Sequence, residues 1–137
     1  MINITEDQFF SETPILQEID KKLQIHDQLP DYSTINTIEH ILPQTLDNEW
    51  KIYLGNDASD LLLQNYTNTI GNLCLISIRA NSSVGQNPFE KKKNSYTDIS
   101  GLTRDIIGRN VIWNIASIKE RSDFLAELAL KIWIWKI

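Results

Sequence analysis

A histidine, an acid and two asparagines are the residues in this sequence whose types and spacing suit chemistry on a phosphodiester. His40 directly follows Glu39 near the end of a short apolar run, and Asn72 and Asn81 come later in the chain. A neutral imidazole can take a proton from water, because its reference pKa of about 6.5 lies near working pH. Carboxylate and amide oxygens, completed by water, are the ligands that Mg²⁺ prefers. The set therefore indicates a metal-dependent nuclease, with His40 activating water and Glu39 and Asn81 available as ligands.

Each of these residues also has a purely structural explanation. A single histidine after an apolar strand is most often a partly buried, hydrogen-bonded side chain. Asn72 follows Gly71, a pair that is typical of a turn, and Asn81 precedes two serines, as a helix cap would. At this point the pattern alone leaves the catalytic and the structural interpretation both open.

Two strands must bring these residues together. The sequence predicts a first strand from Ile35 to Leu42, ended by Pro43, and a second strand over 72–78 after a turn at Gly71. Neighbouring residues on a strand point to opposite faces, so Glu39 and His40 share a site only where the strand bends or ends. More than thirty positions separate the strands, and a connection of that length usually has a function.

The asparagines have different expected places. Asn72 stands at the start of the second strand, where its amide can donate to and accept from backbone groups and so tie the strand ends together. Asn81 is expected in a short helix that follows Ile78 and ends near Gly85. A ligand in that helix can face the two strands.

Helices are predicted for most of the remaining chain. The expected elements are a helix from Thr13 to about Leu29, a loop over 44–57 held to the core by Trp50, Tyr53 and Leu54, a helix over 58–66, a helix capped by Asn87 and ending near Tyr96, a break at Ser100–Gly101, a short helix over 102–107, and a final helix over 115–135. The final helix carries an apolar stripe suited to the core. The predicted class is α+β and helix-rich, with an N-terminal helical segment over 1–34 and one compact unit over 35–137.

Composition narrows the possible partners and the location. The chain has 137 residues, a hydrophobic content of 42% and a net charge of −5, which fits one globular domain rather than a protein that grips nucleic acid by charge alone. Lys91, Lys92 and Lys93 form the compact basic cluster, which by itself is usually a solvated helix face. One cysteine excludes an intrachain disulfide, and no apolar run approaches the roughly 20 residues that span a bilayer. The expected location is cytoplasmic, without a membrane.

Several segments, taken in order, carry a resemblance to a known family. They are Ile38-Glu39-His40-Ile41-Leu42-Pro43-Gln44, Trp50, Ile70-Gly71-Asn72-Leu73-Cys74-Leu75-Ile76-Ser77, Asn81, Asn87-Pro88-Phe89-Glu90-Lys91-Lys92-Lys93, Tyr96, Trp113-Asn114, and Arg121 through Leu125-Ala126-Glu127-Leu128-Ala129 to Ile132-Trp133. Together they resemble the C-terminal HNH (His-Me finger, ββα-metal) domain of GmrSD-type modification-dependent restriction enzymes. The resemblance covers nearly the whole chain.

The resemblance implies a ββα-metal core inside helical surroundings. It implies cleavage or nicking of DNA with Mg²⁺ or Mn²⁺, in defence against foreign DNA such as that of phages. By this comparison His40 is the general base, Asn81 a metal ligand, and Asn72 the residue that orders the hairpin loop. Glu39 takes the place of the metal-binding acid, although many HNH sites have the shorter aspartate there.

The resemblance also bears on contacts with DNA and with other domains. Lys92 matches the family's lysine after the phenylalanine and is expected to meet a phosphate or the transition state, and Arg79, Lys91 and Lys93 are further expected DNA contacts. Such a domain usually follows an N-terminal nucleotide-hydrolysing or partner-sensing domain, so the chain is expected to be a fragment of a larger protein. Apolar Trp133, Ile134 and Ile137 predict a contact between the C-terminal helix and another domain or subunit.

Two other interpretations remain. A non-catalytic module would keep the fold for DNA or partner binding, and the negative net charge favours it. Cleavage of RNA instead of DNA has no discriminating residue in the sequence.

Overall fold

The computed structural model describes residues 13–23, 30–96 and 100–134. The predicted extension of the first helix over 24–29 lies outside these residues, as does the predicted end of the last helix at Trp135. The side chains of Trp133, Ile134 and Ile137, on which the expected C-terminal contact rests, also lie outside the described part.

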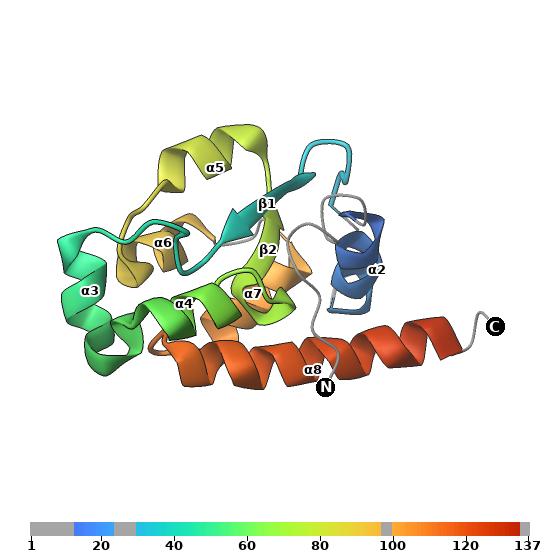
Figure 1. Cartoon of the computed structure of the whole chain (residues 1–137). Helices are drawn as coiled ribbons and strands as arrows, with labels where there is room; N and C mark the ends of the chain where they lie inside the picture. The colour runs from blue at the N-terminus through green and yellow to red at the C-terminus, as the bar shows by residue number, and fades with distance from the viewer. Residues whose placement is uncertain (1–12, 24–29, 97–99, 135–137) are drawn as a thin grey trace.

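A two-stranded antiparallel sheet lies at the centre of the molecule (Figure 1). β1 spans Thr37–His40 and β2 spans Leu73–Ile76, with Thr37 opposite Ile76 and His40 opposite Leu73. Both strands are shorter than predicted. Asn72 belongs to a 3-10 turn, and Ser77 accepts a hydrogen bond from the backbone of Ala80 and so begins a helix instead of continuing β2.

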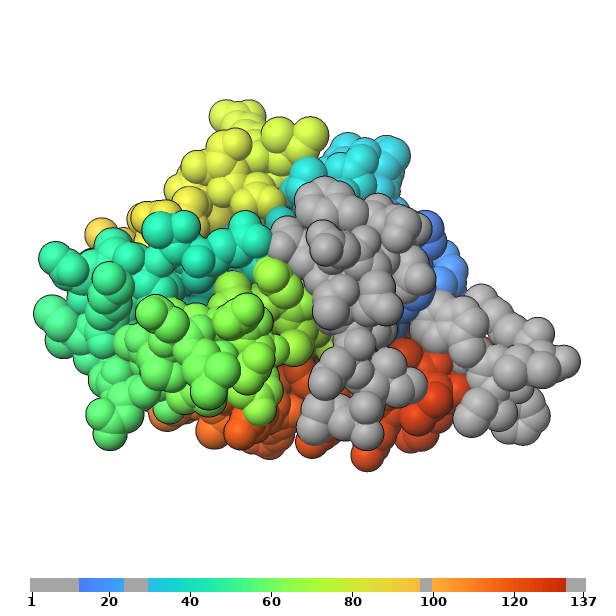
Figure 2. All heavy atoms as spheres, in the orientation of Figure 1, coloured from blue at the N-terminus to red at the C-terminus, as the bar shows by residue number. Residues whose placement is uncertain are grey.

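Helices surround this sheet. They are α2 (Thr13–Leu23), α3 (Asn48–Leu54), α4 (Asp60–Tyr66), α5 (Ile78–Val84), α6 (Phe89–Ser95), α7 (Gly101–Arg109) and α8 (Ile115–Ile134), with 3-10 turns η1 (Gly55–Ala58) and η2 (Ile70–Asn72). Figure 2 shows α4 next to α8 at the bottom of the molecule, α3 at the left, and α5 at the top. The helix-rich α+β class predicted from the sequence is confirmed.

Local capping explains which predicted helices form. The sequence allows either Asp57 or Ser59 as the cap of the helix predicted over 58–66, and Ser59 takes this role in α4 by accepting from the backbone N–H of Leu62 at 3.2 Å. Gly85 adopts φ 44° and ends α5, also as predicted. These two helices depend on short-range signals, and such signals can be read from the chain directly.

Three predicted boundaries are wrong. The segment expected as a loop over 44–57 contains α3, because the carboxylate of Asp47 accepts the N–H of Trp50 at 2.9 Å and starts a helix. Asn87 is not the N-cap of α6; Pro88 holds that position without a side-chain cap, and the helix begins at Phe89. Ser100 starts α7 with a reciprocal capping box, and this helix continues through Gly108 to Arg109.

The long C-terminal helix α8 holds the start of β2 in place. It packs against η2, where Gly71 approaches so closely that a Cβ would lie 2.1 Å from the carbonyl oxygen of Ile118. Ser122 Oγ accepts the N–H of Gly71 at 2.9 Å, and the buried guanidinium of Arg121 donates to the carbonyls of Gly71 and Leu73. Side chains of α8 therefore satisfy several of the polar backbone groups where the chain enters β2.

The described part of the N-terminal segment packs onto the same core. α2 contacts α7, α8 and β2. Its Asp20 is fully buried, accepts the N–H of Leu102 at 2.7 Å, and receives a hydrogen bond from the hydroxyl of Tyr32. Across the described residues, no helix has the length and apolar character that crossing a membrane requires.

Candidate functional site

A pocket of about 230 Å³ opens at the end of β1. It is lined by Glu39, His40, Pro43, Gln44, Thr45, Asn81, Gly85 and Gln86. Three residues singled out from the sequence, Glu39, His40 and Asn81, thus line one pocket. His40 is the last residue of β1, so the strand ends where both it and its neighbour can face the same space.

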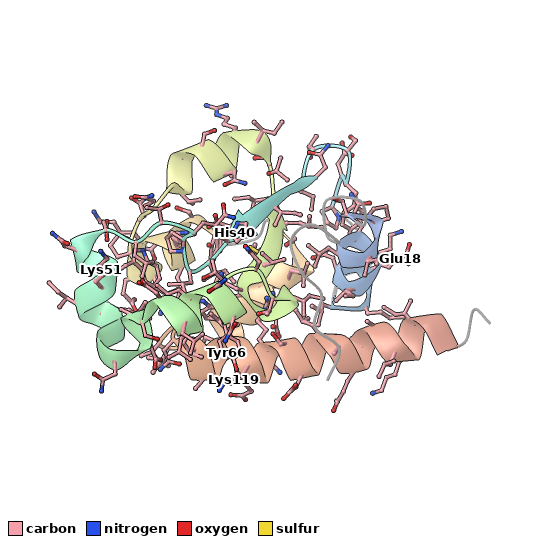
Figure 3. The ribbon with its side chains drawn as sticks, in the orientation of Figure 1. Glu18, His40, Lys51, Tyr66 and Lys119 are labelled. Carbon is pink, nitrogen blue, oxygen red and sulfur yellow. The ribbon has the colours of Figure 1, made fainter. Side chains whose placement is uncertain are left out.

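His40 is half-buried and is held at two points (Figure 3). Its ring nitrogen Nε2 lies 3.0 Å from Oδ1 of Asn68, and its backbone carbonyl accepts a hydrogen bond from Nζ of Lys92 at 2.9 Å. Asn68 is a residue that the sequence does not predict. It lies in an ordinary turn after α4, and nothing in its sequence neighbourhood distinguishes it from Asn65 or Asn56.

Asn81 joins α5 to β1. Its Nδ2 donates to the carbonyl of Ile38 at 2.9 Å and lies 3.4 Å from the hydroxyl of Thr37. The amide nitrogen is thus committed to the strand. The amide oxygen is the atom with which Asn81 can bind a cation.

Glu39 is buried beneath the pocket, with 3% of its surface exposed. Its Oε2 accepts hydrogen bonds from Nζ of Lys92, at 3.1 Å, and from the hydroxyl of Tyr96. Burial raises the pKa of Glu39 above its ordinary value, because desolvation of the carboxylate outweighs the stabilisation from Lys92 and Tyr96. Both hydrogen bonds fall on one oxygen, so Oε1 is the atom of this carboxylate that is available to a ligand in the pocket.

Lys92 does not lie on the surface, where a DNA contact would be expected. Its side chain is fully buried, and its ammonium bridges the Glu39 carboxylate and the His40 carbonyl. The sequence singles out the residue but gives no sign of its burial, since it is the middle member of a lysine triplet. The structure places its charge inside the protein, behind the pocket.

Asn72 is buried and joins four segments. Its backbone carbonyl accepts the N–H of Ile41, and its side chain accepts from and donates to the backbone of Leu42. The same amide donates to the carbonyl of Thr67 at 2.8 Å and accepts from the indole N–H of Trp113 at 3.0 Å. These contacts fix the chain just after β1 relative to the chain just before β2, and Asn72 itself does not line the pocket.

The remaining predicted DNA contacts lie outside the pocket lining. Arg79 on α5 and Lys91 on α6 are exposed. Lys93 is half-buried, pairs with Glu90 at 3.2 Å and lies 5.0 Å from the centre of the Phe89 ring. Arg79 and Lys91 are therefore the better placed of these cations to meet a large polyanion.

The donor set of the pocket fits a hard divalent cation. In the described part of the chain, no three His, Cys, Asp or Glu side chains gather into a group that would hold a metal. The pocket instead offers one carboxylate, Glu39, and the side-chain amides of Asn81, Gln44 and Gln86. Mg²⁺ is commonly bound by one or two protein oxygens and keeps several waters, whereas structural zinc needs about four nitrogen or sulfur ligands. The side chains present thus suit Mg²⁺ or Mn²⁺ and do not suit a structural zinc ion.

Comparison with known protein families gives a match. The family model described as GmrSD restriction endonucleases, C-terminal domain, matches residues 5–128, which is nearly the whole chain. No match was found among curated proteins or among solved structures.

Proposed function

The chain belongs to the family of GmrSD restriction endonuclease C-terminal domains, and from this premise we propose that the pocket at the end of β1 is an HNH-type, metal-dependent endonuclease site. Membership gives the chain a restriction endonuclease-type function, with DNA as the substrate. The finer proposal is that it cleaves or nicks foreign DNA in the cytoplasm, as part of a defence system.

One observation carries the proposal: Asn81 lines the same pocket as the adjacent Glu39 and His40, although it comes much later in the chain. β1 pairs with β2, although α3 and α4 lie between them in the chain, and α5 follows β2 and packs against β1. This order agrees with a ββα-metal core, in which an antiparallel pair of strands supplies the base and the following helix a ligand.

His40 is the proposed general base. A neutral imidazole in the lining of the pocket takes a proton from the attacking water. Hydrogen bonds to the ring and to the carbonyl of His40 restrict both the side chain and the backbone to which it is attached. Because the base is already held in position, less conformational entropy is lost when the transition state forms.

Glu39 and Asn81 are the proposed residues that hold Mg²⁺ or Mn²⁺. When bound, such an ion supplies Lewis-acid stabilisation of the phosphate and of the leaving oxygen. Asn81 is suited to this role because its amide nitrogen donates a hydrogen bond to β1, so its amide oxygen is the atom that would bind the ion. Glu39 is suited because Lys92 and Tyr96 engage only one of its oxygens.

The proposed role of Lys92 differs from the phosphate contact expected from the sequence. A fully buried ammonium has no surface from which to reach DNA. Its contacts instead position the carboxylate of Glu39 and the carbonyl of His40, which belong to neighbouring residues of one strand. Lys92 thus supports the site from behind.

The test is cleavage of supercoiled plasmid DNA in Mg²⁺ or Mn²⁺ by the wild-type chain and by His40→Ala. We expect the variant to lose roughly 10²- to 10⁴-fold in rate, the usual contribution of a general base. Thermal unfolding should be almost unchanged, because the ring is only half-buried. Asn65→Ala, on the exposed side of α4, is the matched control and should cleave like the wild type.

Two outcomes would overturn the proposal. Full activity of His40→Ala would remove it as the base. A wild-type chain that binds DNA but cleaves it with neither cation would favour a non-catalytic binding module. A single-stranded RNA of matched sequence, run in parallel, decides between DNA and RNA as substrate.

A further inference from the structure

The side chain of Asn68 meets the proposed base directly. Its Oδ1 lies 3.0 Å from Nε2 of His40, although the two residues are 28 positions apart. Nε2 of Gln44 lies 3.5 Å from the same oxygen, a long contact. His40 and Gln44 thus both place a nitrogen atom next to the Asn68 side chain, and the amide nitrogen of Gln44 can only donate a hydrogen bond. The amide of Asn68 is therefore oriented with its oxygen toward the histidine.

The backbone on either side of Asn68 is held by hydrogen bonds. The carbonyl of Thr67 accepts from the buried Asn72 amide at 2.8 Å, and the N–H of Thr67 donates to Leu63 at 3.0 Å. The N–H of Thr69 donates to the carbonyl of Tyr66 at 3.2 Å. Asn68 is thus presented from a fixed turn rather than from an unconstrained loop.

The element before this turn is also fixed, through the long C-terminal helix. The ammonium of Lys119 on α8 lies 5.0 Å from the centre of the Tyr66 ring at the end of α4, and Figure 3 shows the two side chains together. α4 itself packs against α8. The position of Asn68 is therefore set by the body of the protein, as a group that orients a base must be.

An amide oxygen accepts hydrogen bonds and never donates them. A neutral imidazole carries one N–H and one nitrogen with an available lone pair. A ring nitrogen that lies against a hydrogen-bond acceptor carries the proton, so the partner of the ring determines the tautomer. With Oδ1 of Asn68 beside Nε2, the proton of neutral His40 belongs on Nε2. The lone pair that takes a proton from water is then on Nδ1.

We propose that Asn68 is a positioning residue that selects the Nε2–H tautomer of His40 and so assigns proton abstraction to Nδ1. The inference rests on the proposed function of His40 as a base. It adds a residue from outside the strands and the helix that supply the pocket, and it gives the turn after α4 a role in the site.

The tautomer can be measured without DNA or metal. With His26→Gln as the background, His40 is the sole histidine of the chain, so its two ring ¹⁵N shifts report the tautomer by NMR. We expect the Nε2–H form at a pH where the ring is neutral. Asn68→Ala removes the acceptor and should give a mixture of the two forms, whereas Asn68→Asp keeps an acceptor oxygen and should retain Nε2–H.

Kinetics supply the second measurement. Asn68→Ala should lower kcat by about 10- to 100-fold, the usual effect of removing a partner that orients a functional histidine, with KM for DNA unchanged. Asn68→Asp should recover most of kcat at high pH. It should lose rate at a higher pH than the wild type does, because a carboxylate beside the ring favours the protonated, inactive form.

Different results overturn different claims. An unchanged Nε2–H form in Asn68→Ala, or equal loss of kcat with identical pH profiles in the alanine and aspartate variants, would remove the positioning role. An inactive wild type with the expected tautomer pattern would instead remove the proposed function and leave the hydrogen bond in place. Asn65→Ala is the matched control. Should the alanine variant unfold, the isosteric aspartate variant alone decides, through its tautomer and its pH profile.

Discussion

Glu39 and Lys92 form an ion pair that the protein has withdrawn from water. Their side chains are 4% and 0% exposed, and the two charged atoms lie 3.1 Å apart. Burying two charges is costly, and removing one partner leaves the other unpaired in a medium that does not solvate it. The pair is therefore a weak source of net stability but a strong constraint on where the carboxylate and the adjoining carbonyl lie.

A double-mutant cycle would measure this coupling. We expect Glu39→Gln and Lys92→Met each to lower the free energy of unfolding by roughly 3–5 kcal/mol, because each leaves an uncompensated buried charge. The double variant should recover most of that stability, since neither charge remains. Urea unfolding of the four proteins gives the coupling energy, and single effects that simply add in the double variant would show that the two groups act independently.

Asn81 is expected to contribute to ion binding through its amide oxygen, while its amide nitrogen ties α5 to β1. Asn81→Ala should weaken Mn²⁺ binding in a calorimetric titration, and Asn81→Asp should keep or strengthen it, because the carboxylate retains an oxygen donor. Ser82→Ala, at an exposed position next to it on α5, is the control. An isotherm for Asn81→Ala that superimposes on that of the wild type would exclude Asn81 as a ligand.

At this scale the sequence predicts the pocket residues Glu39, His40 and Asn81 but not the side chains that support them. The pocket residues belong to a short motif and a nearby helix, where residue type and spacing carry information. Asn68 and Tyr96 act through contacts made only after folding, with no local pattern that marks them as supports. Lys92 stands out in the sequence for its charge, and only the fold shows that the charge is buried.

Among the elements, those with strong end signals are predicted best. Ser59 and Gly85 mark helix ends through local hydrogen bonding and a left-handed backbone, and the predicted stripe of α8 is buried at Ile118 and Leu125. The helix α3 is not predicted, because an aspartate before a polar stretch also fits a loop. Of the three residues predicted to hold this segment to the core, Trp50 and Leu54 are buried, although in a helix and not in a loop, whereas Tyr53 is exposed.

Gly71 is where the contact between η2 and α8 is closest. A Cβ at this position would lie 2.2 Å from Ser122 Oγ and 2.7 Å from Ser122 N, so the helix would have to move. We expect Gly71→Ala to lower the free energy of unfolding by about 1–3 kcal/mol or more, the range seen for overpacked cores. Gly108→Ala is the matched control: a Cβ there meets nothing within 4 Å, and in a helix the change should stabilise by about 0.5–1 kcal/mol. Equal stabilities of the two variants in urea unfolding would contradict the close packing.

At the scale of the whole molecule, the distribution of charge does not favour binding of DNA by electrostatic attraction alone. The net charge is −5, and one of the cations expected to meet DNA, Lys92, is buried. Exposed Arg79 and Lys91 lie on successive helices, α5 and α6, that contact each other. We therefore expect Arg79 and Lys91 to make a few contacts with phosphates, and we do not expect a broad basic surface to bind DNA.

The salt dependence of DNA binding tests this view. Replacing both Arg79 and Lys91 by alanine should reduce the slope of log K against log salt by about 0.9 for each phosphate that these side chains neutralise. Lys51→Ala is the control, because Lys51 projects from α3 far from His40 in Figure 3. A slope that the double variant leaves unchanged, or that Lys51→Ala lowers equally, would show that DNA approaches elsewhere.

The sequence predicts least well the contacts between site residues that are far apart along the chain. The strand pairing follows from two apolar runs, but Asn72 meets Leu42 across 30 positions and Trp113 across 41. Periodicity and capping report on neighbours within a few residues. Contacts of this span depend on how the whole core packs.

The hydrogen bonds from α8 to the start of β2 determine when, during translation, the site can form. A ribosome extends the chain from its N-terminus, so every pocket residue has been polymerised well before Arg121 and Ser122. Until those two side chains emerge, the backbone of Gly71 and Leu73 lacks the partners that satisfy it in the native fold. We therefore expect a nascent chain to contain all the groups for cutting DNA before it can cut, and to acquire that capacity only once α8 has left the ribosome.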